Sequence, residues 1–333
     1  MKKNAILIGS LAVLLAIAGG LACKQEKTGQ APKSPELVYR LKWLFNTSVA
    51  GELYAMEQGI FKAAGLSVEV KPGGPEKDAI KELELGHAQF GVASADMVIR
   101  AMAKGSPVVV AAQLFQVNPL QWIYRPSRTT METPADLKGK VLGVTFGGND
   151  ETIMRALLAK HGIPAEAVEL FSVRYDYTPF YQGDVDLWPV YRNAQGILIE
   201  EKLWKAGEKA AFFDPDAAGV RFVANSVVTT RDMMDNRPEV VKRFVSALLT
   251  AWEAAMDPAN SEETVGIIHA YDPDTPPEQI RKQLALTREF VKPSSDFSIG
   301  DIDIPAWEET EQIMAANGLI PDPVNVGKAL MAP

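Results

Sequence analysis

Short apolar runs alternate with amphipathic segments along most of the chain. Residues 38–45 alternate bulky and polar side chains and are predicted to form a β-strand, which the polar residues 46–48 end. Residues 51–65 carry apolar side chains at helical spacing, and residues 68–70 begin another strand. This order predicts a βαβ unit with room for a ligand where the first strand ends.

The same alternation continues beyond this unit and predicts an α/β fold with mostly parallel sheets. Helices are predicted at 78–85, 97–104, 151–160 and 196–206, and strands at 86–92, 107–116, 141–145, 168–173, 185–187 and 220–229. From residue 231 onward the pattern is helical. We therefore expect two α/β lobes, the first formed by 36–128 plus 231–333 and the second by 129–230. The chain would cross between them twice, which is the geometry of a hinge that closes over a ligand cleft.

Length and charge agree with this picture. The chain has 333 residues, which is long for one core and sufficient for two lobes. Its net charge of −8 argues against a nucleic-acid partner and against binding to an anionic membrane surface.

The N-terminal residues 1–22 have the pattern of a signal peptide. Lys2 and Lys3 precede an apolar run at 5–18, and small residues lead to Cys23. The only cysteine of the chain stands directly after this segment, which predicts a lipidated N-terminus followed by a flexible tether at 24–35. The protein would then be held on the membrane through Cys23, in the periplasm or at the cell surface. A plain signal peptide or an uncleaved anchor with an incidental cysteine is the alternative.

The candidate ligand contacts of the first lobe lie at strand ends. Trp43 can offer a flat apolar face to a planar ligand, and its alternative role is in the core. The next candidates are polar or glycine residues at the ends of the predicted strands: Asn46, Thr47, Ser48, Gly74, Ser94, Asp96 and Gln113. For the polar residues among them that begin helices, capping of the helix is the competing interpretation.

A glycine turn at the start of a predicted helix supplies the first candidates of the second lobe: Gly147, Gly148, Asn149 and Asp150. Such turns bind anions through free N–H groups and the helix dipole. Here Asp150 and Glu151 already occupy the first turn, which favours a neutral or cationic ligand.

Aromatic residues are unusually dense between 175 and 191. The candidates from this stretch and the residues that follow it are Tyr177, Trp188, Tyr191, Arg192 and Gln195. The alternative is that the aromatic side chains form a core wall.

The stretch from Trp43 to Leu66 also carries a family resemblance. Its spacing, W-x-x-N-x-x-x-x-G-x-x-x-A-x-x-x-G-x-F-x-x-A-G-L, resembles the opening of the periplasmic substrate-binding proteins of ABC importers. The similar branch contains the binders of thiamine pyrimidine precursors and of aliphatic sulfonates. The resemblance covers about 37–257. It implies a fold of the type II periplasmic-binding-protein kind, a small-molecule ligand, and ABC permease and ATPase subunits as partners.

The segment 184–195 resembles a second-lobe strand of the pyrimidine binders, where a Tyr-Trp-Asn-x-Glu pattern is common. Tyr191, Arg192 and Asn193 take the places of the first three residues, and Gln195 stands where the acidic residue is usual. An amide in that place offers both a donor and an acceptor, which suits a ring that carries a carbonyl group.

We expect a solute-binding lipoprotein that captures a small planar heterocycle, such as a thiamine pyrimidine precursor, and is not an enzyme. We expect no metal and no cofactor, because His87, His161 and His269 lack metal-ligand spacing. One alternative keeps the fold and binds an alkanesulfonate, nitrate or other organic anion with Arg192 as charge partner. A pyrimidine synthase-type enzyme and a sensor that does not serve transport are the others.

Overall fold

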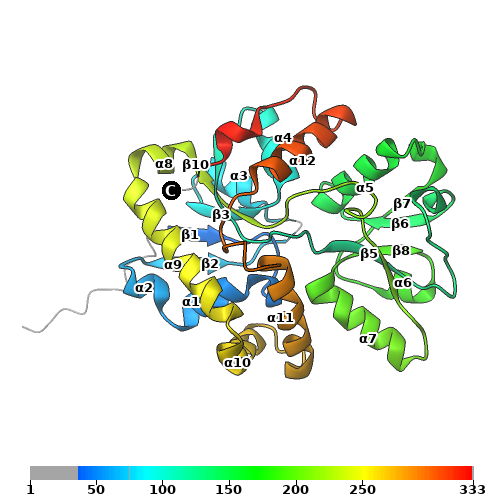
Figure 1. The fold of residues 1–333 in the computed structure, drawn as a ribbon, viewed down its shortest axis with the longest axis horizontal. Helices are drawn as coiled ribbons and strands as arrows, with labels where there is room; N and C mark the ends of the chain where they lie inside the picture. Colours follow the sequence, from blue (N-terminus) through cyan, green and yellow to red (C-terminus); the bar gives the residue numbers. More distant parts are fainter. Residues whose placement is uncertain (1–36, 75, 332–333) are drawn as a thin grey trace, which may run out of the picture. The chain divides into compact units, whose positions relative to one another are not determined.

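The computed structural model describes residues 37–74 and 76–331, and these form two five-stranded sheets with flanking helices (Figure 1). None of the helices within the described residues is long and apolar enough to cross a membrane. The predicted signal peptide, Cys23 and the tether lie outside these residues.

The first sheet has the strand order β2-β1-β3-β10-β4. Its strands are β1 (Leu37–Arg40), β2 (Val68–Lys71), β3 (Phe90–Ala93), β4 (Val108–Gln113) and β10 (Ser226–Thr230). The second sheet has the order β7-β6-β8-β5-β9. It consists of β5 (Leu120–Tyr124), β6 (Val141–Val144), β7 (Glu169–Ser172), β8 (Leu187–Tyr191) and β9 (Ala211–Phe213).

Both sheets are mixed, whereas the sequence pattern predicted mostly parallel ones. β1 is parallel to β2 and β3, but β10 is antiparallel to β3 and β4. In the second sheet β6 is parallel to β7 and β8, but β5 is antiparallel to β8 and β9. The reversed strands are those beside the crossings, because β5 takes the chain into the second sheet and β10 returns it to the first.

The crossings also differ from the expected lobe boundaries. β5 belongs to the second sheet, so the chain leaves the first sheet between 114 and 119, before the expected boundary at 128. β10 belongs to the first sheet, so the return is complete before 230. β5 and β9 are short strands without a clear alternating pattern, and neither was predicted.

Helices cover both faces of each sheet. Their bounds are α1 (Ala50–Glu57), α2 (Ile60–Ala63), α3 (Ala79–Glu84), α4 (Ala95–Ala103), α5 (Asn149–Lys160), α6 (Thr178–Gln182), α7 (Ile197–Lys205), α8 (Arg231–Asn236), α9 (Pro238–Met256), α10 (Ser261–Tyr271), α11 (Pro277–Val291) and α12 (Ile304–Ala316). In the first lobe, α1 and α9 share one core with β1. The helices α3, α4 and α12 belong to a second core.

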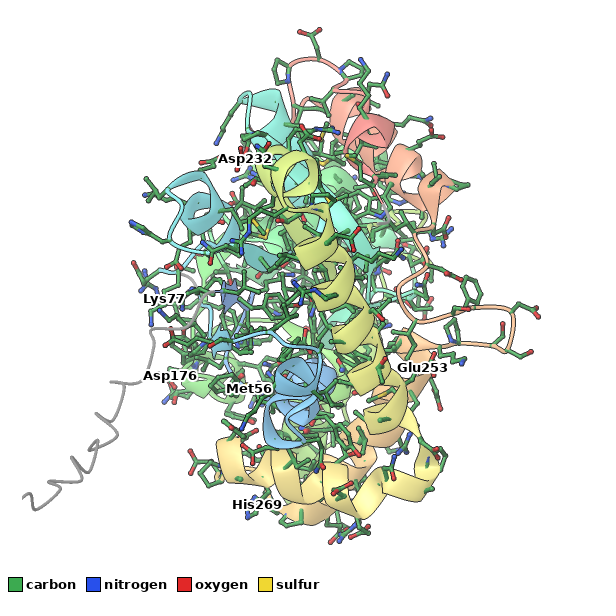
Figure 2. All side chains as sticks on the ribbon, turned by 90° about the vertical axis from the view of Figure 1, so that its left-hand side faces the viewer. Met56, Lys77, Asp176, Asp232, Glu253 and His269 are labelled. Atoms are coloured by element: carbon green, nitrogen blue, oxygen red, sulfur yellow. The ribbon has the colours of Figure 1, made fainter. Side chains whose placement is uncertain are left out.

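The long helix α9 runs along one side of the first lobe, with α1 next to it (Figure 2). The two helices approach closely because Gly51 has no side chain: a Cβ there would lie 2.2 Å from the Trp252 ring. Trp252 itself is fully buried. This packing fixes the start of α1, and with it the loop that carries Trp43.

Buried polar contacts connect the second lobe to α11. A π-helical turn at Arg192–Gly196 directly follows β8. From this turn, Asn193 Nδ2 donates to Ser48 Oγ at 3.2 Å and to Thr287 Oγ1 at 2.9 Å. Gln283 Nε2 in turn donates to the carbonyl of Ala194 at 3.1 Å. The end of β8 is thereby held against both α11 and the start of α1.

Candidate functional site

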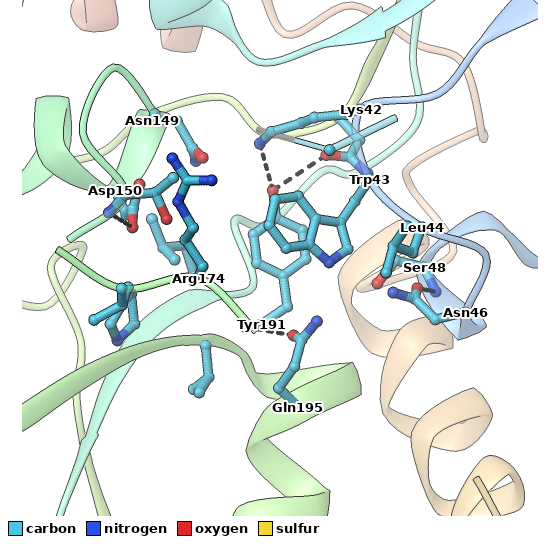
Figure 3. Close-up of a pocket in the computed structure, with 18 of the residues that line it drawn as sticks. Lys42, Trp43, Leu44, Asn46, Ser48, Asn149, Asp150, Arg174, Tyr191 and Gln195 are labelled. Carbon is cyan, nitrogen blue, oxygen red and sulfur yellow. Dashed lines mark hydrogen bonds between the residues drawn. The ribbon is translucent and has the colours of Figure 1, made fainter. Parts of the chain in front are cut away.

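A cavity of about 250 Å³ is lined by residues that precede or follow strands of both sheets (Figure 3). It lies where β1, β6 and β8 end, as expected for an α/β fold. Twelve of the predicted contact residues line it: Trp43, Asn46, Ser48, Gly74, Gly147, Gly148, Asn149, Asp150, Tyr177, Trp188, Tyr191 and Gln195.

Trp43 lies in a loop, since β1 ends at Arg40 and not near residue 45 as its alternating pattern suggested. The loop is held by a hydrogen bond from Gly73 N to the Trp43 carbonyl at 2.9 Å. Gly73 is required for this approach, because a Cβ there would lie 2.1 Å from the Leu41 carbonyl oxygen. The Trp43 and Tyr175 ring centroids lie 5.5 Å apart with the planes tilted by 41°, so Trp43 contacts an aromatic side chain of the second lobe.

The three polar residues after Trp43 have different roles: some cap the following helical turn, and some line the cavity. The Asn46 side-chain oxygen accepts a hydrogen bond from Ser48 N at 2.8 Å, which caps the short 3-10 helix Thr47–Val49. Thr47 does not line the cavity. It is buried and donates to Gln283 Oε1 at 2.7 Å.

Acidic side chains occupy the glycine turn before α5. Asp150 Oδ2 accepts a hydrogen bond from Thr145 N at 2.7 Å, and burial raises the pKa of this carboxyl to about 6. Glu151 accepts a hydrogen bond from Gly147 N at 2.7 Å and pairs with Arg155 at 2.8 Å. The acids thus bind backbone N–H groups that a bound anion would otherwise use. Asn149 is also buried, and its Nδ2 has no hydrogen-bond partner among the described residues.

Tyr191 joins the two sides of the cavity. Its hydroxyl accepts a hydrogen bond from Lys42 Nζ at 2.8 Å and donates to Asn225 Oδ1 at 3.1 Å (Figure 3). The Tyr191 backbone N donates to Gln195 Oε1 at 3.3 Å. The lysine comes from the first lobe, the tyrosine from the second, and Asn225 from the connection between them.

Tyr177 and Trp188 form the apolar wall of the second lobe. Their rings lie 5.7 Å apart, and Trp188 also lies 6.3 Å from Phe180. Trp188 is 2 % exposed, so it is largely a core residue that reaches the cavity with one edge. Burial raises the pKa of the Tyr177 hydroxyl to about 12, so that side chain is uncharged.

The other four predicted contacts lie elsewhere. Ser94 donates to Asp96 Oδ1 at 2.6 Å at the start of α4, and Asp96 Oδ2 lies 3.8 Å from Arg100 without a hydrogen bond of its own within the described residues. Gln113 Oε1 accepts hydrogen bonds from Trp307 Nε1 and Asp303 N. Arg192 stacks its guanidinium on the Phe212 ring at 3.8 Å. The structure therefore does not place Arg192 as a charge partner in this cavity.

Sequence reasoning missed several residues of the lining. Among them are Lys42, Lys77, Phe146, Arg174 and Asn225. Phe146 is 53 % exposed, an unusual state for a phenylalanine directly after a buried strand. Three basic side chains and two acidic ones, Asp78 and Asp150, thus line the cavity. The expectation of a neutral or cationic ligand considered only the acidic turn and overlooked these cations.

The family model "NMT1/THI5 like" matches residues 46–261, which is more than half of the chain. The chain belongs to this family. Its expected kinship with the periplasmic substrate-binding proteins is confirmed, and it is a substrate-binding protein of this type.

Three relatives are similar over most of their length. A protein of Haemophilus influenzae named for thiamine biosynthesis is 26% identical, over 84% of this chain and 87% of its own. The riboflavin-binding protein of Chloroflexus aurantiacus is 22% identical, over 99% of this chain and 97% of its own. The formylaminopyrimidine-binding protein of Halalkalibacterium halodurans is 22% identical, over 94% of this chain and 95% of its own.

Among solved structures, the alkanesulfonate-binding protein of Xanthomonas axonopodis pv. citri bound to MOPS has a TM-score of 0.68 to this chain. It is 17% identical, and the match covers 90% of this chain and all of that one. This likeness confirms the periplasmic-binding-protein fold with two α/β lobes.

Proposed function

We propose that this protein is the solute-binding component of an ABC importer and holds a small planar heterocycle between its two lobes. A thiamine pyrimidine precursor is the first candidate. The observation that carries the proposal is that aromatic side chains from both lobes, Trp43 on one side and Tyr177 and Tyr191 on the other, line one cavity. Two of the relatives, which are named for binding a pyrimidine and a flavin, support the choice of a planar ring.

The cavity suits a small ring by size and by chemistry. Its volume of about 250 Å³ lies just below the range of roughly 300–1,000 Å³ that is typical of ligand sites. Apolar faces stabilise a ring by stacking, while the side-chain amides of Asn46, Gln195 and Asn225 offer hydrogen bonds at its edge. This combination fixes both the plane and the orientation of the ligand.

Closure follows from the same contacts. The ligand would first bind one lobe, and stacking and hydrogen bonds from the other lobe would then stabilise the closed arrangement. The bond from Lys42 to Tyr191 is one contact that exists only when the lobes are together. The permease would recognise this closed form, and the ATPase would drive release.

The cellular location of the protein is part of the same proposal. The protein would act in the periplasm or at the cell surface, anchored through a lipid on Cys23. The periplasmic-binding-protein fold supports the compartment, and the sequence pattern before Cys23 supports the anchor.

Calorimetric titration with an aminopyrimidine, a flavin and an alkanesulfonate tests the proposal. Trp43→Ala should weaken binding of the preferred ring about tenfold, because a stacked aromatic contributes roughly 0.5–1.5 kcal/mol beyond the apolar area that it buries. Trp204→Ala is the matched control, since Trp204 is 73 % exposed and outside the cavity lining. Equal affinity of the Trp43 variant and the unaltered protein would contradict the proposal.

An organic anion such as an alkanesulfonate is the second candidate. It is favoured by the basic side chains of the lining, Lys42, Lys77 and Arg174. A ring-free sulfonate should then bind with an affinity that falls with salt, and removal of Trp43 should matter little.

We propose that the protein is not an enzyme, because the function rests on reversible capture. The relatives named for binding support this proposal. Turnover of a bound pyrimidine, or consumption of a protein side chain, would contradict it.

A further inference from the structure

Oxygen atoms in the cavity lining are largely occupied by the protein itself. Asn46 Oδ1 accepts from Ser48 N, Asn225 Oδ1 accepts from the Tyr191 hydroxyl, and Gln195 Oε1 accepts from Tyr191 N. In each of the three amides, the nitrogen is the group that is left for a ligand.

In each of the two acids of the lining, one carboxylate oxygen is occupied in the same way. Asp78 Oδ1 caps α3 by accepting from Ile80 N at 2.8 Å and Lys81 N at 3.3 Å. Asp150 is buried and accepts from Thr145 N. Both carboxylates therefore stabilise local backbone structure.

Donors, by contrast, remain available. Asn149 is 8 % exposed, and its Nδ2 is buried in the lining without a hydrogen-bond partner among the described residues. Leaving such a donor unpaired costs roughly 1–3 kcal/mol, so a bound acceptor would be favoured there. Lys42, Lys77 and Arg174 line the same cavity. Lys42 also donates to the Tyr191 hydroxyl, and Arg174 pairs with Glu76 at 2.9 Å. Figure 3 draws Asn149 and Arg174 on the side of the second lobe.

We propose that the ring ligand carries an anionic, oxygen-rich substituent, such as a phosphate monoester or a carboxylate, and that Asn149 donates to it from within a lining of basic side chains. This inference rests on the proposed function and narrows its ligand class. A phosphate offers several acceptor oxygens, which matches the surplus of donors better than a neutral hydroxyl does. The inference also revises the preference for a neutral or cationic ligand that the acidic turn suggested.

Matched ligands test the inference by calorimetry on the purified chain. The panel is a hydroxymethyl-aminopyrimidine, its phosphate monoester and the corresponding carboxylate, with riboflavin and its 5′-phosphate as a second ring. At least one anionic form should bind about tenfold tighter than its parent alcohol, and this preference should shrink as NaCl rises. Alcohols that bind as tightly as both anionic forms would overturn the inference and leave the proposed function intact.

A ring-free alkyl phosphate separates the two proposals. If it binds as tightly as the ring phosphate, the ring assignment fails and the anion assignment stands. If no member of the panel binds, both fail.

The Asn149→Asp variant tests the donor directly. It preserves size but replaces the buried donor with an acidic group, and an acidic residue in the first turn suits a helix N-terminus, so α5 should still form. The preference for the anionic form should fall at least tenfold. Asn317→Asp, at the C-terminal end of α12 and outside the lining, is the control: it loses the hydrogen bond to the Ile313 carbonyl and some stability, but should leave the preference for the anionic form unchanged. If the Asn149 variant lost the same amount of affinity for the anionic and the alcohol forms, the proposed role of Asn149 as a donor to the anionic group would be contradicted.

Discussion

Lys42 Nζ donates a 2.8 Å hydrogen bond to the hydroxyl of Tyr191. Lys42 follows β1 of the first sheet, while Tyr191 ends β8 of the second. The same hydroxyl donates to Asn225, just before the strand that returns the chain to the first sheet. One side chain therefore links both lobes and their connection at the cavity, which makes it a direct probe of closure.

Replacement of this hydroxyl should weaken ligand binding. In Tyr191→Phe the ring remains for stacking, but Lys42 and Asn225 lose their shared partner. A net hydrogen bond contributes about 1 kcal/mol, so affinity should fall about fivefold, mainly through faster dissociation. Stopped-flow fluorescence measures this rate. Tyr181→Phe is the control outside the lining, and a Tyr191 variant that dissociates at the same rate as this control would count against the link.

Phe146 should contribute to binding without contributing to stability. Its side chain is 53 % exposed at the cavity, so a ligand or closure of the lobes can bury it. Burial of a phenylalanine provides roughly 1.5–3 kcal/mol, so Phe146→Ala should weaken binding tenfold or more and leave the melting temperature almost unchanged. Leu85→Ala, similarly exposed but remote from the lining, should alter neither. A large fall in melting temperature for Phe146→Ala would show instead that the residue is structural.

A methyl group at Gly73 should disturb the loop that holds Trp43. The added Cβ would lie 2.1 Å from the Leu41 carbonyl oxygen, and Gly73 N also bonds to the Trp43 carbonyl. Gly73→Ala should cost about 1–3 kcal/mol of unfolding free energy and weaken ligand binding together. Gly266→Ala is the control, because a Cβ added there would meet no other atom within 4 Å and alanine favours helices. Chemical denaturation and titration of both variants measure the two effects.

Much of the fold was predictable because it depends on local periodicity. The βαβ unit and the helices α5 and α9 follow from apolar spacing that the sequence displays. The direction of β5 and β10 and the place of the first crossing depend on pairing between distant strands, which spacing does not encode.

In the candidate site, too, some residues could be predicted from local sequence and others depend on tertiary contacts. Trp43, Asn149 and Tyr191 were predictable because they follow a strand, start a helix or end a strand, and strand ends meet at one edge of a sheet. Lys42 and Arg174 were not predicted as cavity residues. Both lie in loops, and the sequence around a basic loop residue does not indicate whether its side chain faces a cavity or solvent. Gln113 and Arg192 looked like contacts in the chain, but tertiary partners, Trp307 and Phe212, occupy them.

Glu52 makes stability depend on pH. It is fully buried in α1, accepts a hydrogen bond from the Tyr39 hydroxyl at 3.1 Å, and burial raises the pKa of its carboxyl from 4.5 to about 7. Its raised pKa contributes stability that is complete below pH 4.5 and is lost as the pH rises through 7. The loss amounts to roughly 3 kcal/mol at alkaline pH.

The melting temperature should therefore fall between about pH 5 and pH 8, and Glu52→Gln should flatten this dependence. Differential scanning calorimetry across this range measures both. Glu263→Gln is the control, because the Glu263 carboxylate also accepts a hydrogen bond from a tyrosine but is exposed at the surface. Its melting temperature should depend on pH as steeply as that of the unaltered chain. A Glu52 variant with that same slope would show that other groups set the dependence.

The central claim, that the cavity between the two sheets holds a planar heterocycle, is tested most directly by native mass spectrometry of the purified chain. Mild release and identification of a co-purified ligand should give one aromatic heterocycle per chain, and Trp43→Ala should carry less of it. A bound aliphatic sulfonate or other ring-free solute, retained equally by the Trp43 variant, would contradict the claim.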